Sequence, residues 1–214
     1  MENQNRLNIK GISLIELLVA LVICGMVVAG IYRVFIAQTK AYTVQDQVVE
    51  VQQSVRSAME ILLRDLRMAG FDDDNIKSTI AITNAIATPL RDNAITVDYE
   101  YYDKLTVQYQ RHTVAYWRDD SLRLMRKLTV NDDARPEEAL LENVEELNFS
   151  YGVDANEDGA LDKWVSSGGV ETAKVVAVRV TLTARPVQVN PNVQMVSPRT
   201  LDSTVTLRNL CLVR

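Results

Sequence analysis

Residues 10–16 read Lys-Gly-Ile-Ser-Leu-Ile-Glu, and an apolar run follows them to about Ile31. At about 1.5 Å rise per residue, the run of about 20 residues makes a helix of about 30 Å, one hydrocarbon thickness. Its only charged residue is Glu16. Because a charge inside the membrane costs roughly 2.5–3.5 kcal/mol, we predict a transmembrane helix in which Glu16 has a partner or a function. Glu16 lies about one turn from the end, so reaching the interface is a simpler alternative.

This stretch resembles the class III signal of type IV prepilins and pseudopilins, which has a basic residue, a Gly, an apolar residue, and Glu at the fifth place after the Gly. The resemblance implies that prepilin peptidase cuts between Gly11 and Ile12 and methylates the new N-terminus at Ile12. It also implies that Glu16 recognises another subunit's N-terminus during assembly, where a buried carboxylate and ammonium compensate each other. Many major pilins carry a Pro where this chain has Arg33, so the resemblance favours a minor subunit.

Charge indicates which side of the membrane each part occupies. Arg6 and Lys10 precede the apolar run, so the positive-inside rule keeps residues 1–11 in the cytoplasm. The C-terminal bulk is then exported to the periplasm and stays anchored in inner-membrane lipid. The formal net charge of −5 gives no basic field, and we expect no nucleic-acid partner. Cys24 and Cys211 are too far apart in this arrangement to form a disulfide.

Beyond the membrane run, apolar residues recur every three or four positions, which is typical of one helical face. The face comprises Val44, Val48, Val51, Val55, Met59, Leu62 and Leu66. Gly70 is a candidate left-handed cap, with Phe71 packing back on the last turn. We predict one helix of about 58 residues, near 87 Å long, whose second half needs a covering sheet.

Alternating apolar residues downstream predict antiparallel strands. Residues 119–121 suit a tight turn, and Pro136 suits the start of a short helical turn. The fold class is therefore α+β, with a long helix packed on an antiparallel sheet. The predicted strands are 95–99, 105–109, 113–117, 122–126, 144–151, 174–184 and 204–210.

This element order resembles the pilin fold, and the stretches 66–71, 147–152, 175–185 and 207–209 resemble PilW-like minor pilins. We predict four parts: a leader at 1–11, a transmembrane half-helix at 12–35, an amphipathic half-helix at 36–70, and an exported β-rich domain at 71–214.

A metal-binding pattern lies near residue 158. Oxygen side chains occupy the first, third, fifth and ninth places and Gly the sixth, as in calcium-binding loops, and Ala160 at the seventh place offers its backbone carbonyl. Val165 stands where an EF-hand has its bidentate Glu, so we predict a shorter Ca²⁺ loop between two strands; a solvated acidic turn is the alternative. The candidate ligands are Asp154, Asn156, Asp158, Ala160 and Asp162.

Residues with catalytic potential are few. His112 is the single histidine and has no nearby Cys, which argues against a zinc site or a triad. Residues 166–169 lack the pattern of a nucleophile elbow or a phosphate loop, so a flexible loop suffices. The acidic pairs at 72–73, 119–120 and 132–133 fall at turns. We expect no enzyme activity.

The sequence supports a minor pilin in the initiation or tip complex of a type IV pilus, with prepilin peptidase and other minor and major pilins as partners. A minor pseudopilin of a type II secretion system shares the same features. A membrane-tethered, calcium-dependent adhesion module is the alternative from another class.

Overall fold

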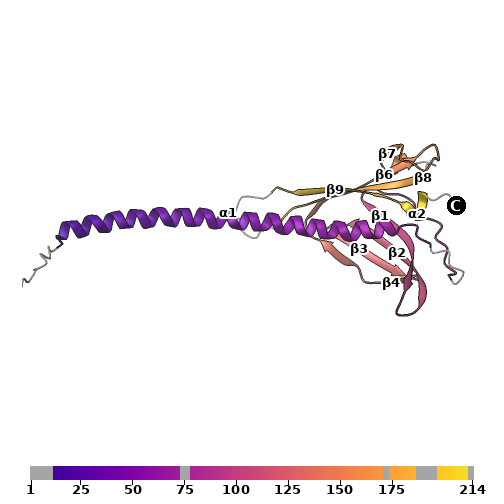
Figure 1. The fold of residues 1–214 in the computed structure, drawn as a ribbon, viewed down its shortest axis with the longest axis horizontal. Coiled ribbons are helices and arrows are strands. Elements are labelled where there is room, and N and C mark those ends of the chain that lie inside the picture. Colours follow the sequence, from indigo (N-terminus) through magenta and orange to yellow (C-terminus); the bar gives the residue numbers. More distant parts are fainter. Residues whose placement is uncertain (1–11, 73–77, 171–173, 187–196, 212–214) are drawn as a thin grey trace, which may run out of the picture. The chain divides into compact units, whose positions relative to one another are not determined.

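The computed structural model describes residues 12–72, 78–170, 174–186 and 197–211, so Gly11 and the predicted leader lie outside the described residues. The chain divides into two compact units, residues 1–46 and residues 47–214. One helix, α1 (Leu14–Met68), contributes to both units and forms the longest ribbon in Figure 1. Each unit is described by itself below.

In the first unit, α1 exposes an almost unbroken apolar surface. Every side chain from Ile12 to Tyr42 is exposed, including Leu14 at 82% and Met26 at 71%. This part of α1 is long and apolar enough to cross a membrane. The prediction of one continuous, largely apolar helix is therefore confirmed.

In the second unit, the C-terminal part of α1 becomes the centre of a folded domain. Its buried side chains begin at Val51 and follow the predicted helical face through Val55, Met59, Leu62 and Leu66. Gly70 has a φ of 74°, and Phe71 N donates a hydrogen bond of 2.9 Å to Met68 O. This confirms the predicted left-handed cap, a conformation that glycine adopts without a steric penalty.

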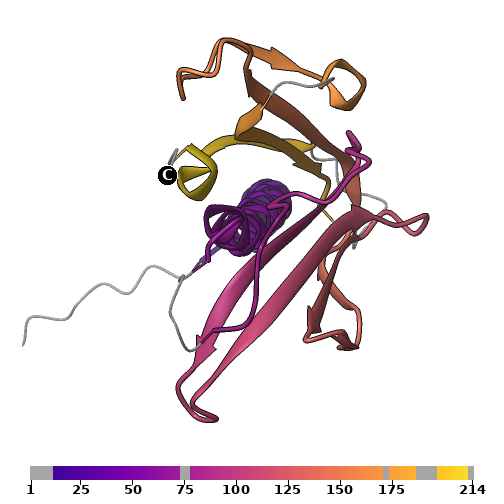
Figure 2. The same ribbon diagram turned by 90° about the vertical axis from the view of Figure 1, so that its right-hand side faces the viewer.

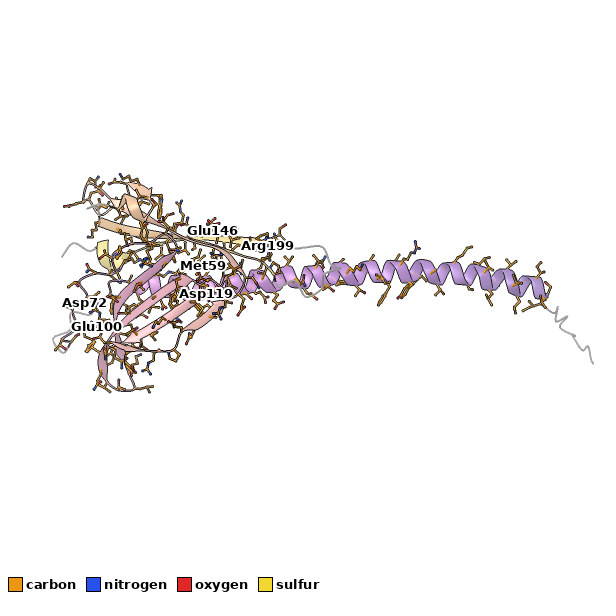
Figure 3. The ribbon with its side chains drawn as sticks, turned by 180° about the vertical axis from the view of Figure 1, so that it is seen from behind. Met59, Asp72, Glu100, Asp119, Glu146 and Arg199 are labelled. Atoms are coloured by element: carbon orange, nitrogen blue, oxygen red, sulfur yellow. The ribbon has the colours of Figure 1, made fainter. Side chains whose placement is uncertain are left out.

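The first sheet contains five antiparallel strands in the order β1-β2-β3-β4, with β5 also paired to β3. Figure 2 shows β1 and β2 running along one side of the helix. Figure 3 places Asp119 and Glu100 toward opposite ends of this sheet. The strands are β1 (Ala94–Asp103), β2 (Gln108–Arg118), β3 (Leu124–Val130), β4 (Asp133–Ala134) and β5 (Glu138–Leu141).

Two predictions for this region were wrong. The segment predicted as a strand at 105–109 is mainly a turn, because Asp103 Oδ1 accepts from Leu105 N and Oδ2 accepts from Thr106 Oγ1. The strand predicted at 113–117 instead extends back to Gln108. No helical turn starts at Pro136, because the residues that follow pair with β3 as β5. The turn predicted at 119–121 is confirmed by the Leu122 N bond of 3.1 Å to Asp119 O.

The second sheet has the order β7-β6-β8-β9, so the strands form two sheets where the sequence suggested one. Its strands are β6 (Val144–Asp154), β7 (Lys163–Val165), β8 (Lys174–Ala184) and β9 (Arg199–Thr206). The predicted strands at 144–151 and 174–184 are confirmed. Ser167–Gly169, expected to be a flexible loop, forms a short 3₁₀ helix, η1.

The C-terminal strand predicted at 204–210 was partly wrong. β9 ends at Thr206, and a short helix, α2 (Arg208–Cys211), follows it. The side chain of Asn209 explains this change of direction, since its Nδ2 donates to Ala69 O at 3.2 Å. The amide thus satisfies a carbonyl left over at the end of α1, as helix termini require.

Both sheets contribute to one hydrophobic core around the C-terminal part of α1. Met59, labelled in Figure 3, is 2% exposed, and Tyr116 from β2 and Phe149 from β6 are fully buried in the same cluster. The part of α1 from Val51 to Leu66 therefore belongs to the domain core.

Candidate functional site

The first turn of α1 presents the predicted assembly residue. Ser13 precedes the helix, and its Oγ accepts a hydrogen bond of 3.3 Å from Glu16 N. Leu17 N donates to Ser13 O at 3.2 Å. Ser13 is therefore the N-cap and Glu16 is the third helical residue, which is the Ser-x-x-Glu spacing of a capping box with the serine half of the box formed. Ser13 was not among the predicted site residues, although the Ser-x-x-Glu spacing before an apolar run indicates an N-cap.

Capping leaves the Glu16 side chain free of intrachain bonds among the described residues and exposed at the positive end of a helix dipole. Ile12, the predicted new N-terminus, is 75% exposed one turn earlier. A negative charge surrounded by exposed apolar side chains is suited to pairing with a cation from another molecule. Gly11, on the other side of the predicted cut, lies outside the described residues.

The predicted calcium ligands extend from Asp154, the last residue of β6, through the connection to β7. Asp154 Oδ2 accepts from Gly159 N at 2.7 Å, and Asn156 Oδ1 accepts from Asp158 N at 3.1 Å. Asp158 Oδ1 accepts from Ala160 N at 2.7 Å, while Asp162 Oδ2 accepts from Ala155 N at 2.8 Å. Each of these four side chains therefore places one oxygen against the backbone of its own loop.

Burial differs strongly within this loop. Asp154 is 1% exposed, whereas Asn156, Asp158 and Asp162 are exposed. Asp154 Oδ1 has no hydrogen-bond partner among the residues that the structure describes. Within those same residues, no three acidic, histidine or cysteine side chains are close enough together to hold a metal ion.

The sole histidine lies on the first sheet beside aromatic rings. The His112 ring stacks on Tyr101 at a centroid distance of 4.9 Å and is tilted against Tyr99 at 5.4 Å. Burial lowers the pKa of His112 below its usual value. Among the described residues its ring neighbours are aromatic and its side-chain polar contact is Gln110 Oε1 at 3.5 Å, so its environment is that of a packed strand residue.

The other polar residues weighed in the sequence also have structural contacts. Asp119 Oδ1 accepts from Arg123 N at 2.8 Å, and its Oδ2 lies 2.7 Å from Arg123 Nη2. Asp132 has a φ of 67° in the turn between β3 and β4. These carboxylates close turns, as predicted for acidic residues at those positions.

Comparison with known families gives two separate matches, one at the N-terminus and one in the C-terminal half of the chain. Residues 6–32 match the family described as the prokaryotic N-terminal methylation motif. Residues 114–209 match the family described as type IV pilus-assembly protein W. The chain belongs to the type IV prepilin superfamily. A search of curated proteins found no match.

The two matches cover different parts of this prepilin. The methylation motif includes Gly11, Ile12 and Glu16 together with most of the apolar part of α1. The pilus-assembly match includes the C-terminal part of β2, all of β3 to β9 and the loop from Asp154 to Asp162. The N-terminal helix is thus related to proteins with the methylation motif, and most of the two-sheet domain is related to a pilus-assembly family.

Proposed function

We propose that this prepilin is a minor pilin that helps to initiate or cap a type IV pilus. Prepilin peptidase cuts between Gly11 and Ile12 and methylates Ile12. The mature chain stays in the inner membrane through residues 12–35, with its two-sheet domain in the periplasm, until it joins other minor and major pilins.

The observation that carries the proposal is the exposed apolar surface of α1 with a single carboxylate, Glu16, in its first turn. An apolar helix suits both lipid and a bundle of like helices, so the same segment serves before and after assembly. Glu16 then restricts the axial positions at which neighbouring subunits can pack. An unpaired charge in apolar surroundings is costly, and a pair with the N-terminal ammonium of another subunit offsets that cost.

A minor pseudopilin of a type II secretion system would use the same helix in the same way. The match of residues 114–209 to a pilus-assembly family favours the pilus. The exposed turn at Leu105 is a candidate surface for a separate adhesive role, but no feature of the described residues favours that role over assembly.

Partner capture tests the proposal. The full chain, tagged at its C-terminus, is crosslinked in its native membrane and purified, and partners are identified by mass spectrometry. We expect other pilins in the parent sample and their depletion with Glu16→Ala at equal protein level. Recovery of secretion-system pseudopilins without pilus components, or of no pilin-like partner at all, would overturn the assignment.

A further inference from the structure

The buried carboxylate at the end of β6 is the starting point. Asp154 is 1% exposed, yet its Oδ1 has no hydrogen-bond partner in the described part of the chain. Its Oδ2 accepts from Gly159 N at 2.7 Å, so the carboxylate is directed into the loop between β6 and β7. A buried carboxylate oxygen without a partner is unfavourable, and a bound cation would satisfy it.

The backbone of this loop turns around the same point. Glu157 has a φ of 62° and Gly159 a φ of 84°, so the chain reverses sharply beside Asp154. Asp162 N then donates to Val153 O at 3.0 Å and returns the chain to the sheet. Asp154 and Asp162 each use one oxygen for a loop N–H, which leaves their second oxygens for a ligand. Asp158 accepts from Ala160 N with Oδ1 and from Asn156 Nδ2 with Oδ2, so ion binding at Asp158 releases the exposed Asn156 amide.

We propose that this loop binds one Ca²⁺ ion through Asp154, Asn156, Asp158, the backbone carbonyl of Ala160 and Asp162. Ca²⁺ takes six to eight oxygen ligands in flexible geometry, which a loop of carboxylate, amide and carbonyl oxygens can supply with water. The three acidic side chains are not gathered closely enough in the described structure, so the exposed Asp158 and Asp162 turn toward the buried Asp154 when the ion binds. This inference is independent of the pilin assignment.

The loop is attached to the sheet by residues that hold its ends in place. A Cβ on Gly152 would lie 2.5 Å from Leu161 Cδ1 and 3.3 Å from the Trp164 ring, so glycine allows both side chains to pack on β6. The guanidinium of Arg179 lies 4.2 Å from the centre of the Trp164 ring. With its ends fixed, the loop has a limited set of conformations, and binding requires only local movement. Trp164 is therefore positioned to report ion binding by fluorescence.

The test uses the full chain in detergent, stripped of metal with a chelator and then titrated with CaCl₂ or MgCl₂. Thermal unfolding and Trp fluorescence are followed in a Trp117→Phe background, which leaves Trp164 as the single Trp. We expect Ca²⁺ to raise the Tm and change the fluorescence with a Kd of roughly 10⁻⁴–10⁻³ M, the range of extracellular calcium modules. Mg²⁺ should have a much smaller effect, because it demands near-octahedral geometry and dehydrates reluctantly.

Charge-neutral variants locate the site. Asp158→Asn and Asp154→Asn should each lose at least tenfold in Ca²⁺ affinity, while Asp120→Asn, an exposed turn carboxylate elsewhere, should match the parent. Asp158→Asn decides the result if Asp154→Asn does not fold, since Asp158 is exposed. No response of the parent to Ca²⁺, an equal response to Mg²⁺, or parental affinity in Asp158→Asn would overturn the proposal.

Discussion

Asp65 of α1 and Arg126 of β3 form a buried ion pair in which Nη2 lies 3.1 Å from Oδ2. Their side chains are 3% and 13% exposed, and Tyr116 Oη donates to the same Oδ2 at 2.6 Å. Burial, with a contribution from the Asp65 charge, raises the pKa of Tyr116 far above its usual value, so its hydroxyl remains a donor. This cluster fixes the position of the helix on the first sheet, because the buried Asp65 carboxylate is stable only where Arg126 can pair with it.

Removal of one member of this cluster should be strongly destabilising. We expect Arg126→Met to lower the free energy of unfolding by about 3–5 kcal/mol, because the buried Asp65 then keeps only Arg64, a more distant partner at 3.6 Å whose side chain is 67% exposed. The double variant Asp65→Leu/Arg126→Met should recover much of that loss, since neither charge remains. Chemical denaturation of the full chain in detergent, followed by fluorescence, measures both changes.

Arg123→Met is the matched control for Arg126→Met. Arg123 pairs with Asp119 at 2.7 Å, but their side chains are 38% and 18% exposed, so solvent screens the pair. We expect a much smaller loss in the free energy of unfolding than in Arg126→Met. If the two Arg variants lose the same free energy of unfolding, burial of the Asp65–Arg126 pair does not determine its contribution to stability.

His112 should make stability depend on pH below neutrality. Burial lowers its pKa from the ordinary value of 6.5; Asp65 and Asp103 oppose that shift, and Arg126 adds to it. The unfolded chain therefore binds a proton at a higher pH than the folded chain, so stability is lost as the pH falls below about 6.5 and through the folded pKa.

Because His112 is the single histidine of the chain, its imidazole signal can be followed without overlap from other histidines. NMR of the labelled imidazole should give a midpoint below 6.5 in the folded chain. His112→Phe, which keeps an aromatic ring beside Tyr101, should lose less stability than the parent on acidification. A midpoint at or above the ordinary value would contradict the effect of burial.

Gly11 should control processing. We expect Gly11→Val to leave a full-length, unmethylated precursor in the membrane and to abolish piliation, because a side chain at this position blocks the peptidase. Intact-mass spectrometry of the membrane-extracted chain distinguishes the precursor from a mature chain that begins at methylated Ile12. The variant keeps residues 1–10 unchanged, so we expect it to insert into the membrane like the parent. Equal membrane levels of variant and parent are therefore the control. Normal cleavage in Gly11→Val would remove the basis for the signal assignment.

Glu16 should act after processing. We expect Glu16→Ala to be cleaved and methylated like the parent but to enter sheared pilus fractions at a small fraction of the parental level, because the partner ammonium loses its carboxylate. Glu50→Ala, on an exposed part of α1 outside the apolar run, is the matched control and should assemble normally. Parental piliation in Glu16→Ala would argue against charge pairing as the assembly contact.

The sheet arrangement illustrates the limits of sequence patterns. Alternation correctly located the strands that became β6 and β8, but it did not separate two sheets. It also continued through Leu105 and Val107, where Asp103 accepts hydrogen bonds from the next residues and closes a turn. The alternation of apolar and polar residues indicates which side chains face a core. The pairing of strands and the hydrogen bonds of turns depend on the rest of the fold.

The sequence by itself determined the features that depend on neighbouring residues: the apolar helix with Glu16 near its start, the left-handed stop at Gly70, and the oxygen spacing from Asp154 to Asp162. Periodicity, φ preference and ligand spacing are local properties, so one stretch of chain is sufficient to specify them. Only the tertiary structure brought Arg126 to Asp65, 61 positions away, and buried Asp154 with one oxygen left unpaired. Those features depend on which distant strands pack together, because burial and charge pairing are set by the core as a whole.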